Sequence, residues 1–451
     1  MSTALKAPHQ IAWAVGLTLA ASSAAQAQDL TRAEEAIVRY VDDHTEEAVA
    51  FLERAVNINS GTMNHAGVRE VARLFEAELS AMGFDARWIE LPAQVNRAGH
   101  LFAEIDGGEG HRLLLIGHLD TVFEEQSPFQ RFGRDGATAS GPGVADMKGG
   151  DVVLLLALKA LHSVGALDRA RIIVALTGDE EKPGRPLSLS RADLVQAGMR
   201  SDVALGFEGG VDGTGTATVA RRGSSRWTLR VVGQRGHSSQ IFGARYGAGA
   251  VFEAARILDD FYDEVRGEPY LTFNPGVILG GTRVSYDEAA AAGEAYGKTN
   301  VIPQEVVVDG GLRFISPEQE ERARLAMREI VARGLPMTTA TIAFEDGYPA
   351  MPPTPGNYEL LASLDRVSRD LGFGPVEAVD PGRRGAADIS FVAPYVSGLD
   401  GLGVAGHGSH TVAETVDLSS LPLVTKRAAV LIYRLTRPDA VRIGGVSRPI
   451  R

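Results

Sequence analysis

Residues 113–151 constrain the fold more than any other stretch of the chain. The stretch begins with an apolar run without periodicity, which predicts a buried parallel strand carrying His118 and Asp120 at its carboxyl end. A glycine-rich loop that carries Asp146 and includes Gly149 and Gly150 follows, and the apolar run over residues 152–161 predicts a helix behind it. Ligand sites in open α/β sheets lie beyond the carboxyl ends of strands. We therefore expect an α/β fold with two potential metal ligands, His118 and Asp146, at one such edge.

Taken alone, either residue has an ordinary structural interpretation, because aspartates are common in glycine-rich turns and many histidines are structural. Together, the segments GHLDTV (117–122) and GVADMKGG (143–150) resemble the paired signature of the M20 family of di-zinc metallopeptidases. That family includes glutamate carboxypeptidase, succinyl-diaminopimelate desuccinylase and aminoacylase. The resemblance covers about residues 50–435. It implies a zinc-exopeptidase-like catalytic domain, with a mixed sheet flanked by helices, and an inserted α+β ferredoxin-like lid and dimerisation domain.

Composition limits the class of protein. A chain of 451 residues exceeds the usual size of one hydrophobic core, so we expect two domains. The net charge of −12, with no local run of lysine or arginine to offset it, argues against nucleic-acid binding. Because the chain has no cysteine, disulfides and thiolate metal sites are excluded, and any transition metal must be held by histidines and carboxylates.

The first 27 residues match a cleavable secretory signal. Lys6 precedes an apolar segment over residues 11–21, and the segment ends in small residues before Ala27. An ordinary apolar helix or a membrane anchor is the alternative, but the segment is short for a membrane span. We therefore expect cleavage after Ala27, a periplasmic or secreted protein, and no membrane attachment after cleavage.

The rest of the chain divides into three parts by pattern. Residues 28–217 are expected to form the first part of the catalytic domain, residues 218–347 the inserted lid, and residues 348–451 the second part of the catalytic domain. Within the insert, strand-like segments such as RWTLRVVGQ and EVVVDGGLRF flank a helical pattern, which favours an α+β domain. The proline-rich segment after Gly347 suits a domain boundary.

Three further carboxylates follow strand-like runs. Glu180 and Glu181 come after one such run, and Glu208 comes after the next. A solvated acidic turn is the alternative, which the position at the end of a buried strand disfavours. Near the C-terminus two histidines lie three residues apart, and His410, followed by Glu414, matches the family's H-x-x-x-E pattern. His407 is therefore expected to be a neighbour of the site and not a ligand.

The resemblance assigns a metal-binding role to five of these residues. Asp146 would bridge two ions, His118 and Glu208 would complete one site, and Glu181 and His410 the other. This implies two Zn²⁺ per subunit, although a site of histidines and carboxylates is also compatible with Co²⁺ or Mn²⁺.

The resemblance also assigns catalytic and substrate-binding roles. Glu180 would be the general base, and Asp120 would orient His118. His237 matches a histidine thought to reach the partner subunit's active site and stabilise the oxyanion, so it would act in trans within a homodimer formed through the lid. Asn300 and Arg313 match the lid motif N-x-I-P followed by D-x-R, although Asp309 and Arg313 are separated by more residues than this motif has, and would bind substrate.

The segment RRGAADISFVA resembles the family's glycine-rich G-x-x-D-A stretch. Gly385 would offer backbone contacts to substrate, whereas Asp388 could equally be a helix N-cap. The sequence thus predicts an exported, zinc-dependent exopeptidase that resembles glutamate carboxypeptidase and hydrolyses a C-terminal peptide or N-acyl-amino-acid amide bond. The alternatives are a deacylase acting on a small non-peptide N-acyl compound, or a non-catalytic metal- or solute-binding protein, which the presence of Glu180 disfavours.

Overall fold

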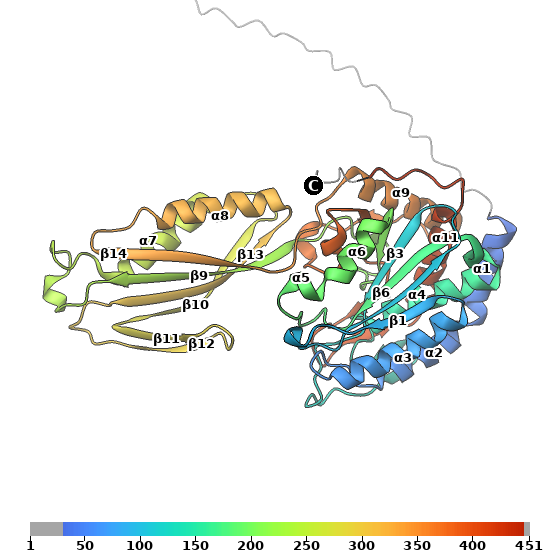
Figure 1. Ribbon diagram of the computed structural model, residues 1–451, viewed down its shortest axis with the longest axis horizontal. Coiled ribbons are helices and arrows are strands. Elements are labelled where there is room, and N and C mark those ends of the chain that lie inside the picture. The colour runs from blue at the N-terminus through green and yellow to red at the C-terminus, as the bar shows by residue number, and fades with distance from the viewer. Residues whose placement is uncertain (1–29, 446–451) are drawn as a thin grey trace, which may run out of the picture.

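The computed structural model describes residues 30–445 (Figure 1). The predicted signal segment, residues 1–27, lies outside the described residues. Across residues 30–445, no helix combines the length and apolar character needed to cross a membrane.

A six-stranded mixed sheet forms the centre of the larger part of the molecule. Its strand order is β1-β2-β6-β3-β7-β16, and β6, β3, β7 and β16 run parallel while β1 and β2 are antiparallel to their neighbours. The strands are β1 (Asp85–Ile89), β2 (His100–Asp106), β3 (Arg112–His118), β6 (Arg171–Thr177), β7 (Val203–Gly206) and β16 (Ser397–Leu399). The predicted parallel strand before His118 is thus confirmed as β3, which lies between two parallel neighbours.

Helices cover both faces of this sheet. Alternate residues of β3 show the two layers, because Leu113 and Leu115 join one apolar core whereas Leu114 and Ile116 join another. The first core contains α1 (Arg32–Asp43), α2 (Thr45–Val56), α3 (His65–Ala81), α4 (Lys148–Ser163), α9 (Pro355–Asp370) and α11 (Ser420–Leu435). The short helices on the second face are α5 (Leu187–Ser190), α6 (Ala192–Arg200) and α10 (Ile389–Val392).

Helix α4 begins earlier than the sequence predicted. Gly149 and Gly150 were expected in the preceding loop, but both lie in the first turn of α4. A Cβ atom on Gly150 would stand 1.9 Å from the carbonyl oxygen of Phe207, and one on Gly149 would stand 2.3 Å from that of Val144. The glycines therefore allow the helix start to pack closely against the end of β7 and against the loop before α4.

A second sheet lies to one side of the first (Figure 1). It is antiparallel, with the order β10-β13-β9-β14, and alternate residues of β9, including Trp227 and Leu229, face α7 and α8 in a separate core. Ser316 caps α8 by accepting a hydrogen bond from Gln319 N at 3.2 Å. The elements are β9 (Gly223–Gly233), α7 (Gly249–Asp260), β10 (Thr272–Gly281), β13 (Glu305–Phe314), α8 (Pro317–Val331) and β14 (Thr338–Asp346), with a hairpin of β11 (Arg283–Asp287) and β12 (Ala292–Tyr296).

Two small sheets complete the larger part. One has the order β17-β18-β5-β4, and its outer hairpin loop carries His410. Pairing of β18 with β5 therefore brings the C-terminal hairpin beside the segment that leads to Asp146. The strands are β4 (Gly133–Asp135), β5 (Thr138–Ser140), β17 (Gly406–His407) and β18 (Thr415–Asp417), and a separate pair is formed by β8 (Thr216–Ala217) and β15 (Glu377–Ala378). This mixed α/β architecture agrees with the predicted fold class.

Candidate metal centre

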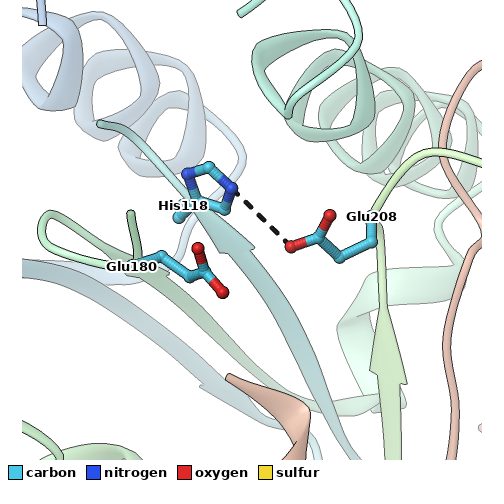
Figure 2. Close-up of side chains that lie close together, drawn as sticks. All are labelled: His118, Glu180 and Glu208. Atoms are coloured by element: carbon cyan, nitrogen blue, oxygen red, sulfur yellow. Dashed lines mark ion pairs between the residues drawn. The ribbon is translucent and has the colours of Figure 1, made fainter. Parts of the chain in front are cut away.

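His118 stands at the carboxyl end of β3 and is almost fully buried. Its Nδ1 lies 3.0 Å from the carbonyl oxygen of Asp120 and 3.4 Å from Asp120 Oδ1. Its Nε2 has no hydrogen-bond partner, but lies 3.3 Å from Asp146 Oδ1 and 3.6 Å from Glu208 Oε1 (Figure 2). A histidine whose one nitrogen is fixed by an acceptor and whose other nitrogen faces carboxylates has the geometry of a metal ligand.

Asp120 connects the His118 strand to the next strand end. Its carboxylate accepts hydrogen bonds from the backbone N–H of Glu180 at 3.0 Å and of Glu181 at 3.1 Å, and from the Thr62 hydroxyl at 2.6 Å. The side chain is completely buried. Asp120 therefore positions both the imidazole of His118 and the loop that carries the two glutamates.

Asp146 lies between the two histidines. Its Oδ1 faces His118, and its Oδ2 lies 3.1 Å from His410 Nε2, which is also 3.0 Å from Glu181 Oε2. His410 has φ of +65°, a backbone conformation that is strained for a residue with a side chain. The hairpin loop thus holds this histidine in a costly conformation that points its ring at the carboxylates.

Glu180 and Glu208 face His118 from the two neighbouring strand ends (Figure 2). One ligand atom from each of these three residues lies within 4.8 Å of the others, and the same holds for His118, Asp146 and Glu181. The structure therefore brings all five predicted metal ligands and the predicted base into one cluster.

The electrostatics of this cluster favour a bound cation. Burial raises the pKa of Glu180 well above its ordinary value and that of Glu181 to about 7. The carboxylates of Asp146 and Glu181 raise the pKa of His410 to about 11. Burial alone would lower the pKa of His118, but Asp120 and Asp146 raise it well above its ordinary value. So many carboxylates in one buried place need positive charge, and histidine and carboxylate donors fit Zn²⁺, Co²⁺ or Mn²⁺.

Glu414 supports the loop of Asp146 from outside the cluster. It accepts backbone hydrogen bonds from Gly143, Ala145 and Asp146 at 3.2, 2.9 and 3.0 Å. The predicted H-x-x-x-E pattern therefore has a physical meaning here, because its histidine faces Asp146 while its glutamate fixes the Asp146 backbone.

A cavity of about 520 Å³ opens on the cluster. Its other wall is cationic and includes Arg221, Arg383 and Arg384. Arg221 is paired with Asp400, and Arg383 with Asp212. Arg384 has no ion pair within residues 30–445. One of its terminal nitrogens, Nη1, donates to the carbonyl oxygen of Gly209 at 3.2 Å, and its Nε and Nη2 have no acceptor.

Burial and the nearby Arg221 guanidinium lower the pKa of Arg384 to about 10, so the side chain is still cationic at neutral pH. Nε and Nη2 form the edge of a guanidinium that binds a carboxylate through two parallel hydrogen bonds. The cavity thus combines the cluster of candidate metal ligands around His118 with an arginine that has no carboxylate partner among the described residues.

Of the predicted substrate-binding residues and the predicted catalytic His237, some line the cavity and others lie in the part of the chain that forms the second sheet. Gly385 lines the cavity, and its carbonyl oxygen accepts a hydrogen bond from Arg221 at 3.1 Å. His237, Asn300 and Arg313 do not line it. His237 is exposed and contacts Ser239 Oγ at 2.8 Å, so within a single chain the structure does not bring it to the cluster. Its predicted role in a partner's site stays a prediction.

Arg313 and Asn300 are both exposed. Strand β13 pairs with β9 in unbroken register up to Phe314, so the segment before Arg313 forms a regular strand, whereas β10 has an irregularity between Pro275 and Val277. Asp388 does precede α10, as predicted for an N-cap, but its side chain makes no capping hydrogen bond. It is buried instead against Arg191, whose Nε donates to it at 2.8 Å.

Sequence reasoning missed Arg221, Arg384 and Arg191. The first two belong to the arginine doublets 221–222 and 383–384, and such basic pairs are conspicuous in an acidic chain. That signal could have marked them for attention. Arg191 carries no comparable local signal.

Comparison with known proteins places this site in a family. The model of peptidase family M20/M25/M40 matches residues 114–434. Carboxypeptidase G2 from Pseudomonas sp. (strain RS-16) is 28% identical over 87% of this chain and 90% of its own length. Succinyl-diaminopimelate desuccinylase from Leptothrix cholodnii (strain ATCC 51168 / LMG 8142 / SP-6) is 28% identical over 63% of this chain and 73% of its own length.

A dinuclear metal-binding peptidase of the M20 family from Bacillus subtilis has a similar fold, with a TM-score of 0.61, 14% identity, and coverage of 88% of this chain and 99% of that one. Both the fold and the site thus define a metal-dependent hydrolase of peptide or amide bonds. The chain belongs to peptidase family M20/M25/M40.

Proposed function

We propose that this protein is an exported, zinc-dependent exopeptidase that releases a C-terminal residue from a peptide or from an N-acyl amino acid. The observation that carries the proposal is the pairing, in one cavity, of the His118 cluster with the unneutralised guanidinium of Arg384. The carbonyl oxygen that anchors Arg384 belongs to Gly209, the residue after Glu208. A cation so close to the cluster favours substrates with a carboxylate a few bonds from the scissile amide.

The chain's own residues would divide the chemistry as follows. His118 and Glu208 would hold one ion, Glu181 and His410 the other, and Asp146 both, since its two oxygens face the two histidines. When bound, zinc would polarise the substrate carbonyl and lower the pKa of its water to roughly 7.

Glu180 would take a proton from the attacking water and deliver it to the leaving nitrogen, which makes the released amine neutral at the moment the C–N bond breaks. Burial raises the pKa of the Glu180 carboxyl well above its ordinary value, toward the range that suits a group that accepts and returns a proton. Arg384, which lines the cavity, would hold the substrate carboxylate through its guanidinium.

The test is release of free amino acid from matched substrates, each offered with a free α-carboxylate and as the corresponding amide. The expected result is hydrolysis that a chelator abolishes and zinc restores. The amide substrates should be hydrolysed much more slowly than those with a free α-carboxylate. Equal hydrolysis of both forms would favour the deacylase of non-carboxylate N-acyl compounds. A protein that binds zinc but hydrolyses no member of the panel would favour a binding function.

Two variants test the assigned roles. Glu180→Gln should keep zinc and lose turnover by about a hundred- to ten-thousand-fold. Arg384→Met should raise KM for substrates with a free carboxylate and leave the slow hydrolysis of the amide substrates unchanged. Arg383→Met should change KM little, because the Arg383 guanidinium is already paired with Asp212. If Arg384→Met left KM unchanged, the carboxylate would be bound elsewhere.

Export and assembly are separate parts of the proposal. The apolar segment and small residues before Ala27 support export, and a mature N-terminus at Gln28 in protein recovered outside the cytoplasm is the expected result.

If His237 acts in trans, mixing inactive His237→Ala with inactive Glu180→Gln should restore activity to about a quarter of the wild-type value, because half of randomly formed dimers then hold one intact site. No recovery on mixing would contradict the role in trans.

A further inference from the structure

Two segments join the six-stranded sheet to the second sheet, and they are hydrogen-bonded to each other. We call residues 221–224 and 347–351 the connector. Arg221 and Met351 exchange both backbone hydrogen bonds at 2.9 Å, and Ser224 N donates to the carbonyl oxygen of Tyr348 at 2.8 Å. The connector leads directly into β9 and out of β14, at the end of the second sheet that faces the first (Figure 1). It therefore forms a short antiparallel ladder between the two sheets.

Arg221, on the first segment of the connector, extends to Glu208 in the cluster of candidate metal ligands. Its Nε donates to Asp400 Oδ2 at 2.5 Å, and its Nη1 donates to the carbonyl oxygen of Gly385. Its Nη2 is buried without a hydrogen-bond partner and lies 3.9 Å from Glu208 Oε2. The other oxygen of Glu208 faces His118. Arg221 thus stands behind the Glu208 carboxylate, on the side away from the histidine.

Tyr348, on the second segment, reaches the predicted base. Its hydroxyl donates to the carbonyl oxygen of Glu180 at 2.8 Å and accepts from Arg191 Nη2 at 2.9 Å. Arg191 also binds the carboxylate and the carbonyl oxygen of Asp179, the residue before Glu180. Tyr348, Arg191 and Asp179 are buried, and Glu180 is half-buried. The backbone of Glu180 is therefore held from two sides, and one of the two holds comes from the connector.

We infer that the connector positions the site: Arg221 sets the orientation of the Glu208 carboxylate, and Tyr348 sets the place of Glu180. Both are positioning residues, because each acts through a residue of the cluster: Arg221 through the carboxylate of Glu208, and Tyr348 through the backbone of Glu180. Since the same ladder carries both, the placement of the second sheet and the geometry of the cluster are mechanically linked. The part concerning Glu180 rests on the proposed function, whereas the part concerning Glu208 is tested by metal binding without turnover.

Tyr348→Phe removes one hydroxyl and keeps the ring, which packs edge-on against Phe391 at 4.8 Å between centroids. With Glu180 no longer held from the connector, we expect kcat to fall about tenfold to a hundredfold, with KM and zinc affinity unchanged. The matched control is Tyr358→Phe, since Tyr358, in the first turn of α9, is exposed and its hydroxyl makes no hydrogen bond to these groups. It should leave kcat at the wild-type value.

Arg221→Lys keeps a positive charge beside Asp400, so the variant is expected to fold, but a single ammonium cannot serve both Asp400 and Glu208. We expect zinc affinity, measured by competition with a chromophoric chelator, to fall about tenfold to a hundredfold. Arg222→Lys is the matched control on the same segment, because Arg222 contacts Thr272 and Gly382 and none of the clustered carboxylates. If Arg221→Lys does not fold, Arg221→Met combined with Asp400→Asn is measured in its place, because no buried charge is then left at position 400 without its partner.

Each outcome decides the inference. A Tyr348→Phe protein with wild-type kcat, or an Arg221→Lys protein with wild-type zinc affinity, overturns the corresponding part. Equal losses of kcat and zinc affinity in both variants would mean a general structural role and would overturn both parts. If the wild-type protein hydrolyses no substrate of the panel, the proposed function fails and the Glu180 part fails with it, while zinc affinity still decides the Glu208 part.

Discussion

The buried guanidinium of Arg191 should contribute several kcal/mol to the free energy of unfolding, and its removal tests this. Its side chain is 0% exposed and is paired with Asp179 at 2.5 Å and with Asp388 at 2.8 Å, which are 0% and 3% exposed. Arg191→Met would leave both carboxylates in the interior without a cation. Removing one partner of a buried ion pair costs about 3–5 kcal/mol. Because Asp388 keeps the Thr177 hydroxyl and Asp179 keeps the Gly184 N–H, we expect a loss within this range and not above it.

Urea unfolding followed by tryptophan fluorescence would measure this loss. Trp227 lies in the second sheet and Trp88 in the first, so a Trp227→Phe background, in protein that begins at Gln28, reports on the first sheet alone. Multi-domain proteins do not unfold in a single step, which makes this separation necessary.

The matched control is Arg200→Met, whose exposed pair with Glu104 at 3.0 Å should be worth about 0–1 kcal/mol. Adding Asp388→Asn to Arg191→Met should recover part of the lost stability, because one of the two buried carboxylates without a cation is then neutral. The reasoning would be refuted if Arg191→Met and Arg200→Met destabilised the protein equally.

Two other predictions follow from buried carboxylates. Asp120→Ala should lower zinc affinity about tenfold to a hundredfold, as measured by chelator competition, because the loop of Glu181 loses the carboxylate that holds its backbone, although the carbonyl oxygen that contacts His118 Nδ1 stays. Burial alone would raise the pKa of Glu34, but the Arg434 guanidinium lowers it below the ordinary value, so the pair stabilises the fold at neutral pH and is lost as pH falls through the folded pKa. Glu34→Gln should therefore cost about 1–3 kcal/mol in urea unfolding at pH 7 and clearly less near pH 3, while exposed Glu35→Gln should show no such pH dependence.

The candidate site was largely predictable because its parts obey local rules. Glu208 and the Glu180–Glu181 pair each follow an apolar run, and parallel strands carry their carboxyl ends to one edge of a sheet. Pattern alone therefore brought these residues together with His118. The mixed sheet and the second antiparallel sheet were predictable for the same reason, since both rest on the periodicity of apolar residues.

The residues that sequence reasoning missed act over long separations. Arg191 meets Asp388 across 197 positions, and Arg221 meets Asp400 across 179. An arginine side chain has no periodicity to reveal which distant carboxylate it will meet, and most arginines are solvated. The start of α4 was missed for a different reason: Gly149 and Gly150 were interpreted as loop formers, whereas they allow close approach of a helix.

The hydrogen-bonded pair of Arg221 and Met351 also has a consequence for how the chain reaches its fold. The two halves of the six-stranded sheet part are separated by roughly 130 residues of sequence, and closing a flexible loop of that length costs about 4 kcal/mol of chain entropy. When the second sheet folds on its own core, its two ends meet and that entropy is already lost. After that, the entropy cost of bringing β16 and α11 to the first sheet is about the same as if they followed β7 directly in the chain. The folded insertion thus acts like a short covalent crosslink between the two halves of that sheet.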